Sequence, residues 1–140
     1  MQRYAKGARG ERELINLFYS LGFSVIRSAG SGVNSISPDI IAIKNGKGIS
    51  LECKAWDSTS VAIEPEKWLA LSEWQRNTLM DTYIAWRMSG EGWYLVRLDE
   101  MSRNEKSYSV TMKKAKAIGR RLEHIGAAAE KVAEETRSQV

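Results

Sequence analysis

Three residues of types suited to phosphodiester chemistry lie close together in the sequence: Asp39, Glu52 and Lys54. The dipeptide Asn45-Gly46 separates the two apolar runs that carry them, and Asn-Gly is a strong signal for a two-residue β-hairpin turn. A turn there places Asp39 directly opposite Glu52 on the neighbouring strand, with Cβ atoms about 5 Å apart. Strand alternation sends Lys54 to the face of Glu52, while Cys53 points away.

Two carboxylates in this arrangement predict a metal site. Like charges that lie side by side destabilise an empty sheet, and a hard divalent cation removes that penalty. Mg²⁺ prefers one or two carboxylates together with water and phosphate oxygens. A lysine beside such an ion could lower the pKa of an attacking water or stabilise charge in the transition state. This combination predicts Mg²⁺-dependent cleavage of a phosphodiester.

The alternative is a surface hairpin with scattered charges and an incidental lysine. Three features favour the site instead. Pro38 directly precedes Asp39, and a loop rich in Gly and Ser lies upstream. The flanking residues are apolar and indicate a largely buried sheet, where unpaired carboxylates are costly: Ile40, Ile41, Leu51 and Cys53.

Hydrophobic periodicity predicts the elements that must position these residues. Helices are expected over 8–21, 65–80 and 112–136, the first ended by Gly22 and the second begun by Pro65. Strands are expected over 23–28, 39–43, 49–55, 82–87 and 93–97, and a loop over 29–37. The order predicts an α/β (α+β) domain with a mixed sheet. We expect a nuclease domain over 1–110 and a C-terminal helical extension of the same domain over 111–140.

Composition sets wider bounds. The 140 residues suffice for one compact domain, and the net charge of +4 with a pI near 9.3 permits a nucleic-acid partner without demanding one. One cysteine and one histidine exclude an internal disulfide framework and argue against a structural zinc site. No apolar run approaches the ~20 residues needed to cross a membrane, so no membrane partner is expected. No signal-peptide pattern is visible, so a cytoplasmic location is expected.

Several short motifs resemble those of a known family. Pro38-Asp39 followed by Glu52-Cys53-Lys54 resembles the loose motif of the PD-(D/E)xK nuclease superfamily. The region from about residue 3 to 97 looks like an archaeal Holliday junction resolvase, on the segments Lys6-Gly7, Glu11-Arg12-Glu13-Leu14, Gly22-Phe23, Arg27-Ser28-Ala29-Gly30-Ser31 and Asn45-Gly46. The resemblance implies a restriction-endonuclease-like mixed central sheet flanked by helices.

The resemblance also implies roles for further residues. Glu11 would complete the metal site with Asp39 and Glu52, and it lies nearer the centre of the helix's apolar stripe than Glu13 does. The alternative for Glu11 is an acid favoured by the helix dipole.

Residues that would contact DNA follow from the same motif positions. Arg12 and Arg27 would bind phosphates, although each could instead be a solvated surface charge. Ser31 would lie near the scissile strand, unless it belongs to a simple linker, and Lys6 would add a contact at the N-terminal arm.

A dimer interface is implied for the helix expected over 65–80. Trp68, Leu71 and Trp74 fall on one face of it, and aromatic residues are enriched in the centre of interfaces. The alternative is that both rings pack within the chain.

The function expected is a homodimeric, structure-selective endodeoxyribonuclease that resolves four-way DNA junctions by paired symmetric cuts. It would use Mg²⁺, for which Mn²⁺ would substitute, and it would leave a 5′-phosphate and a 3′-hydroxyl. Two alternatives stay open: a repair or restriction nuclease of the same superfamily, and a non-catalytic DNA-binding module. The complete set of Asp39, Glu52 and Lys54 argues against the second alternative.

Overall fold

The structure is a computed structural model that describes residues 2–28, 36–55, 57–125, 135 and 137–139. Its helices are α1 (Gln2–Ser20), α2 (Pro65–Thr78), the 3₁₀ helix η1 (Leu98–Glu100) and α3 (Met112–Ile118). Its strands are β1 (Ser24–Arg27), β2 (Ile40–Lys44), β3 (Lys47–Lys54), β4 (Ser60–Ile63), β5 (Asp81–Met88), β6 (Gly92–Arg97), β7 (Ser102–Arg103) and β8 (Tyr108–Thr111). No helix in the described ranges is long and apolar enough to span a bilayer.

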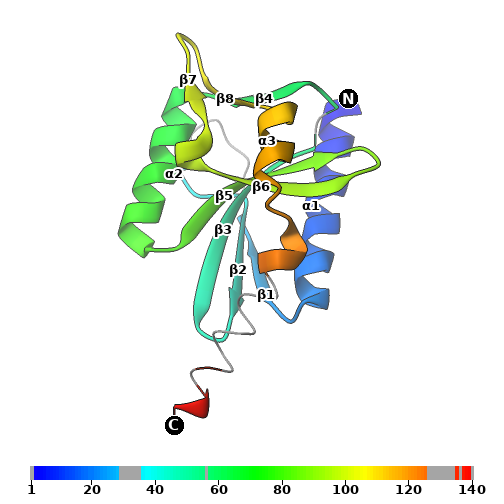
Figure 1. Ribbon diagram of the computed structural model, residues 1–140. Helices are drawn as coiled ribbons and strands as arrows, with labels where there is room; N and C mark the ends of the chain where they lie inside the picture. Colours follow the sequence, from blue (N-terminus) through cyan, green and yellow to red (C-terminus); the bar gives the residue numbers. More distant parts are fainter. Residues whose placement is uncertain (1, 29–35, 56, 126–134, 136, 140) are drawn as a thin grey trace.

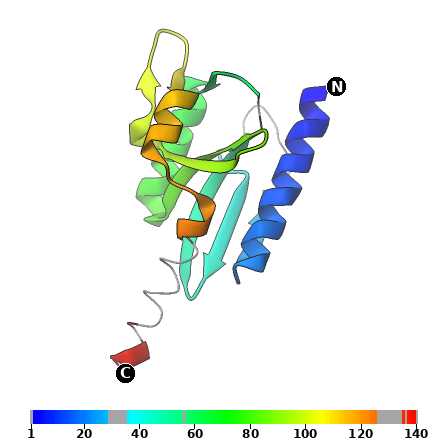
Figure 2. The same ribbon diagram turned by 45° about the vertical axis from the view of Figure 1, so that its right-hand side comes forward.

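A five-stranded mixed sheet in the order β1-β2-β3-β5-β6 forms the centre of the molecule. Only the pairing of β3 with β5 is parallel among these neighbours. In Figures 1 and 2, α1 runs along one side of this sheet and α2 along the other. The expectation of an α+β domain with a mixed sheet between helices is therefore confirmed.

The two faces of the sheet are buried in separate cores. One face packs against α1 through Leu14 and Phe18, and the other packs against α2 through Leu71. Strand β5 divides its residues between the two, with Ala85 in the first core and Trp86 in the second. Each side of the central strands is thus covered by a helix, as is usual where a sheet is buried on both faces.

The hairpin that carries the carboxylates has the predicted register. Lys44 pairs with Lys47, and the pairing continues to Ile40 opposite Leu51. Asn45 and Gly46 have φ angles of +52° and +78°. Positive φ at both central residues is what a type I′ turn requires, so the turn is the one expected from Asn-Gly.

A second, smaller sheet was not predicted. Strands β4, β8 and β7 form it, and they lie on the side of α2. Each strand has two to four residues, which is too short for alternation to be recognised in the sequence. Buried Val61 and Val110 attach this sheet to the core shared with α2.

The prediction of one continuous helix over 112–136 is wrong between residues 119 and 121. Gly119 adopts a left-handed conformation with φ +66° and ends α3. The chain then runs alongside β6, where Leu95 N donates to Arg120 O and Arg121 forms a bridge with Tyr94. Leu122 begins a new helical turn and is buried in the core beside α1.

Candidate active site at the end of strand β3

Asp39 and Glu52 meet where β2 begins and β3 ends. The register places them opposite each other, one step beyond the pair of Ile40 and Leu51. The Asp39 carboxylate turns toward the neighbouring strand, where its Oδ2 accepts a hydrogen bond of 2.9 Å from Cys53 N. Glu52 is only 7% exposed. The hairpin therefore holds two acids together in a largely buried setting.

The charge on Glu52 is poorly compensated. Burial and, after it, the nearby charge of Asp39 raise the pKa of Glu52 to about 7, although the charges of Lys67 and Lys54 lower it. Glu52 Oε1 is buried and accepts no hydrogen bond within the described part of the chain. An acceptor in this state is costly to bury, and a divalent cation would satisfy it.

Lys54 lies two residues beyond Glu52 and is half-buried. Its charge lowers the pKa of Glu52, so the two side chains are electrostatically coupled, as the motif requires. Between them, Cys53 packs against the core beside α1. Burial raises the pKa of the Cys53 thiol well above its usual range, and the charges of Asp39, Glu11 and Glu52 add to this effect. Cys53 is therefore a neutral packing residue in the middle of the site.

Glu11 lies on α1, where the helix comes closest to the end of β3. A Cβ added to Gly10 would lie 2.9 Å from the Cβ of Ala55, so a glycine is needed for this approach. The Glu11 carboxylate forms an ion pair with Arg27 of β1. Within the described ranges, no three His, Cys, Asp or Glu side chains converge as a metal-holding group. The structure thus brings Asp39 and Glu52 together and leaves Glu11 nearby but bound to Arg27.

Glu13, the other acid of the motif, has a structural role. Its carboxylate accepts hydrogen bonds from Arg87 Nε at 2.9 Å and from Trp93 Nε1 at 3.1 Å. These contacts attach α1 to β5 and β6. Because both oxygens of Glu13 are already bonded, Glu11 is the better candidate for the site.

Lys67 is a residue of this site that the sequence analysis missed. It projects from α2, and its Nζ lies 3.7 Å from Glu52 Oε1 while it donates a hydrogen bond of 2.8 Å to Ser37 O. No motif spacing connects it to the hairpin. The available signal was a single lysine in the first turns of a helix that was expected to cover the sheet.

The residues expected to bind DNA have separate positions. Arg12 is exposed on α1, and no hydrogen bond or ion pair involves it within the described part of the chain. Arg27 is bound to Glu11, although its side chain is 67% exposed. Lys6 lies in α1, but its side chain is outside the described part. Ser31 also lies outside the described residues.

The three residues expected at a dimer interface make contacts within the chain. Leu71 is 0% exposed in the core beneath α2, so its side chain cannot reach a partner, and that prediction is wrong for Leu71. Trp68 stacks on Tyr108 at 4.1 Å and donates to Leu98 O. Trp74 Nε1 donates to the buried Ser50 Oγ at 2.8 Å. The small sheet and η1, which the sequence did not reveal, provide the partners of Trp68.

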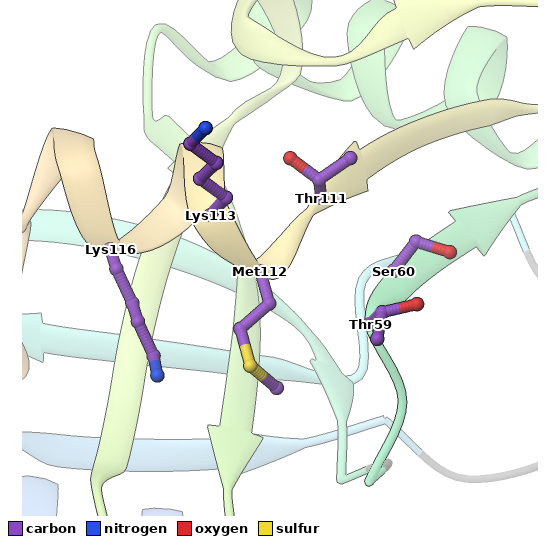
Figure 3. A pocket seen from close by; sticks show the side chains of 6 residues that line it. All are labelled: Thr59, Ser60, Thr111, Met112, Lys113 and Lys116. Atoms are coloured by element: carbon purple, nitrogen blue, oxygen red, sulfur yellow. The ribbon is translucent and has the colours of Figure 1, made fainter.

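A pocket elsewhere on the molecule does not contain these acids. It lies between β4, β8 and the start of α3, lined by Thr59, Ser60, Thr111, Met112, Lys113 and Lys116. Figure 3 shows the two lysine side chains extending in different directions from α3. The Lys116 ammonium forms an ion pair with Glu91 at 2.7 Å. The candidate site therefore remains at the end of β3.

Comparison with known proteins separates the open alternatives. The family described as "Archaeal holliday junction resolvase (hjc)" matches residues 2–133. The chain belongs to this family. A crossover junction endodeoxyribonuclease named Hjc from Methanocaldococcus jannaschii is 35% identical over 109 residues, which cover 77% of each chain. The protein is thus an endodeoxyribonuclease of the Holliday junction resolvases, as expected, and the family is one of metal-dependent nucleases.

Solved structures support the fold. Archaeoglobus fulgidus Hjc, a Holliday junction resolvase, superposes with a TM-score of 0.77 at 22% identity, over 87% of this chain and 96% of that one. The bacterial homing endonuclease I-Ssp6803I gives a TM-score of 0.64 at 15% identity, over 97% and 99% of the two chains. The restriction-endonuclease-like sheet expected from the sequence is confirmed.

Proposed function

We propose that this resolvase cleaves four-way DNA junctions with a Mg²⁺ ion held by Asp39 and Glu52, and that Mn²⁺ substitutes for it. The observation that carries the proposal is the buried Glu52 Oε1, which has no hydrogen-bond donor in the described part of the chain and lies beside a second carboxylate. Oxygen donors of this kind suit a hard cation. When bound, the ion supplies a Lewis acid that activates a water and polarises the scissile phosphate.

The chain's own residues perform the other tasks. Asp39 is oriented by the hydrogen bond from Cys53 N, so one of its oxygens is fixed by the neighbouring strand. Glu52 is held on a strand that is paired on both sides, so its position is rigid. Lys54, coupled to Glu52, stabilises negative charge that develops on the phosphate. The products carry a 5′-phosphate and a 3′-hydroxyl.

We assign the remaining positions from the motif. Glu11 is proposed as a third metal ligand, which requires its ion pair with Arg27 to open. Arg12, Arg27 and Lys6 are proposed to contact phosphates, and Ser31 to lie near the scissile strand. An arginine that leaves Glu11 for a DNA phosphate would free that carboxylate at the moment when substrate binds. We also propose a cytoplasmic location.

A homodimer is proposed because two cuts on opposed strands need two sites at a fixed separation. The outer side of α2 remains the candidate surface, since Leu69 is 57% exposed there. Trp68 and Trp74 would support this surface from inside the chain. Leu69→Glu should give a monomer that nicks junctions without pairing the cuts. A wild-type protein that is monomeric in light scattering yet makes paired cuts would contradict the dimer.

The decisive experiment is cleavage of a synthetic four-way junction with and without Mg²⁺, in competition with a linear duplex of equal length. Asp39→Asn and Glu52→Gln should each slow cleavage by at least about a thousandfold and leave junction binding nearly intact. Asp99→Asn is the control, because Asp99 pairs with Arg97 on the surface, in the turn after β6. Substantial Mg²⁺-dependent turnover in either carboxylate variant would refute the assignment.

A further inference from the structure

Lys67 connects the two segments that carry the catalytic acids. Its ammonium donates to the carbonyl of Ser37, two residues before Asp39, at 2.8 Å. The same ammonium lies 3.7 Å from Glu52 Oε1, the buried atom to which no hydrogen bond is donated in the described part of the chain. One side chain from α2 therefore holds both the start of β2 and the end of β3.

Lys67 lies beside the oxygen at which a cation would bind. Its side chain is 19% exposed and that of Glu52 is 9% exposed, so little water screens the charges between them. At 3.7 Å, the Lys67 ammonium and the Glu52 carboxylate form an ion pair but no hydrogen bond. The Glu52 oxygen therefore still has room for a closer ligand. A divalent ion at this oxygen would lie close to a positive charge that the chain itself supplies.

We propose that Lys67 is a counter-cation built into the carboxylate site, which weakens metal binding to the DNA-free protein and couples metal loading to DNA binding. This inference rests on the proposed function, because it takes Glu52 as a metal ligand. Repulsion between the ammonium and a divalent ion opposes metal entry. A DNA phosphate next to the site adds negative charge and oxygen ligands, which offset that repulsion. By linkage, a metal ion must then favour DNA binding by the same factor.

The alternative is that Lys67 acts only as a tether between α2 and Ser37. Substitution by glutamine separates the two, because glutamine keeps N–H donors on a side chain only one bond shorter but carries no charge. Arginine keeps the charge, and methionine removes both the charge and the donor. Lys113→Met is the matched control, since it removes one positive charge from an exposed position on α3.

The test measures metal binding directly, without cleavage. Calorimetric titration of the DNA-free protein with Mg²⁺, at a pH well above the Glu52 pKa of about 7 so that this carboxylate is ionised in every variant, should show about tenfold tighter binding for Lys67→Gln and Lys67→Met than for wild type. Lys67→Arg and Lys113→Met should bind like wild type. Junction affinity, measured by fluorescence anisotropy with and without Ca²⁺, should depend less on the metal in Lys67→Gln than in wild type.

The outcomes distinguish this inference from the function on which it rests. A folded Lys67→Gln protein that binds Mg²⁺ as wild type does, or more weakly, would overturn the counter-cation and leave the metal site intact. If Lys67→Met does not fold, Lys67→Gln alone decides. A wild-type protein that binds no divalent metal, with or without DNA, would overturn both the metal site and this inference.

Discussion

The two faces of strand β3 differ in polarity: one is apolar and the other is polar. On the face toward α1, Leu51 and its neighbours join the core that contains Leu14 and Phe18. On the face toward α2, Ser50 and Glu52 are both buried and both polar, and α2 supplies Trp74 and Lys67 to meet them. A strand covered by helices on both sides is normally apolar throughout. The polar face is therefore the departure that the proposed metal site would require, and the apolar face holds it in place.

Shortening Leu51 should have the largest effect on stability and little effect on chemistry. Leu51→Ala removes a side chain that is fully buried, so the free energy of unfolding should fall by roughly 2–5 kcal/mol. The folded fraction should still cleave junctions. Urea unfolding and single-turnover cleavage below the transition measure the two quantities. Loss of cleavage in fully folded Leu51→Ala protein would show that the faces are not independent.

The Glu52 face should make stability depend on pH. The pKa of folded Glu52 is about 7 against an ordinary value of 4.5, so the folded state binds more protons than the unfolded state between these values. The stability of the metal-free protein should fall as pH rises from about 4.5 to 7, by roughly 3 kcal/mol from this group.

Glu52→Gln should remove that fall, and Mg²⁺ should reduce it in the wild-type protein, because the ion stabilises the carboxylate. Chemical unfolding at a series of pH values, with and without Mg²⁺, makes the measurement. Identical pH profiles for wild type and Glu52→Gln would contradict the buried, uncompensated carboxylate.

The sequence predicts some features of the Glu52 site and not others. The alternation of Glu52, Cys53 and Lys54 and the Asn-Gly turn are local, so the register and the facing acids followed from the residues alone. Lys67 could not be found in this way, because its place beside Glu52 depends on how α2 packs. The small sheet of β4, β7 and β8 was missed because its strands are short.

The end of α3 at Gly119 was not predicted from the sequence. Ala and Lys favour a helix on both sides of Gly119, and their propensity outweighed the glycine in the prediction. Gly119 nevertheless indicates the end of a helix, because glycine commonly terminates helices in a left-handed conformation. The pairing of residues 120 and 121 with β6 is tertiary and was not visible in the sequence.

A smaller effect should come from the neutral hydrogen bond on the polar face. Ser50→Ala leaves the Trp74 indole N–H without its acceptor, which should cost about 1–2 kcal/mol of stability. Trp74→Phe in the Ser50→Ala background should cost less than it does alone, because the bond is already gone. Additive effects in this double-mutant cycle would mean that the bond contributes nothing.

The smallest effect should be on DNA binding and should come from removing Arg12 on the exposed side of α1. Arg12→Ala should reduce the slope of log affinity against log salt by about one, as the loss of one phosphate contact predicts. Lys113→Ala is the matched control, because it removes one positive charge from an exposed position on α3, away from α1. Equal slopes for wild type and Arg12→Ala, measured by junction binding over a salt series, would remove Arg12 from the DNA interface.

The segment that follows α3 also affects whether another copy of the protein can pair with the edge of the large sheet. Strand β6 is the last strand of the large sheet, so its outer backbone groups are a template onto which a strand from another molecule could add. Arg120 O accepts from Leu95 N, and the guanidinium of Arg120 donates to Leu95 O. The turn at Gly119 therefore brings Arg120 over the outer backbone groups of Leu95, so a strand from another molecule cannot pair with β6 at that residue.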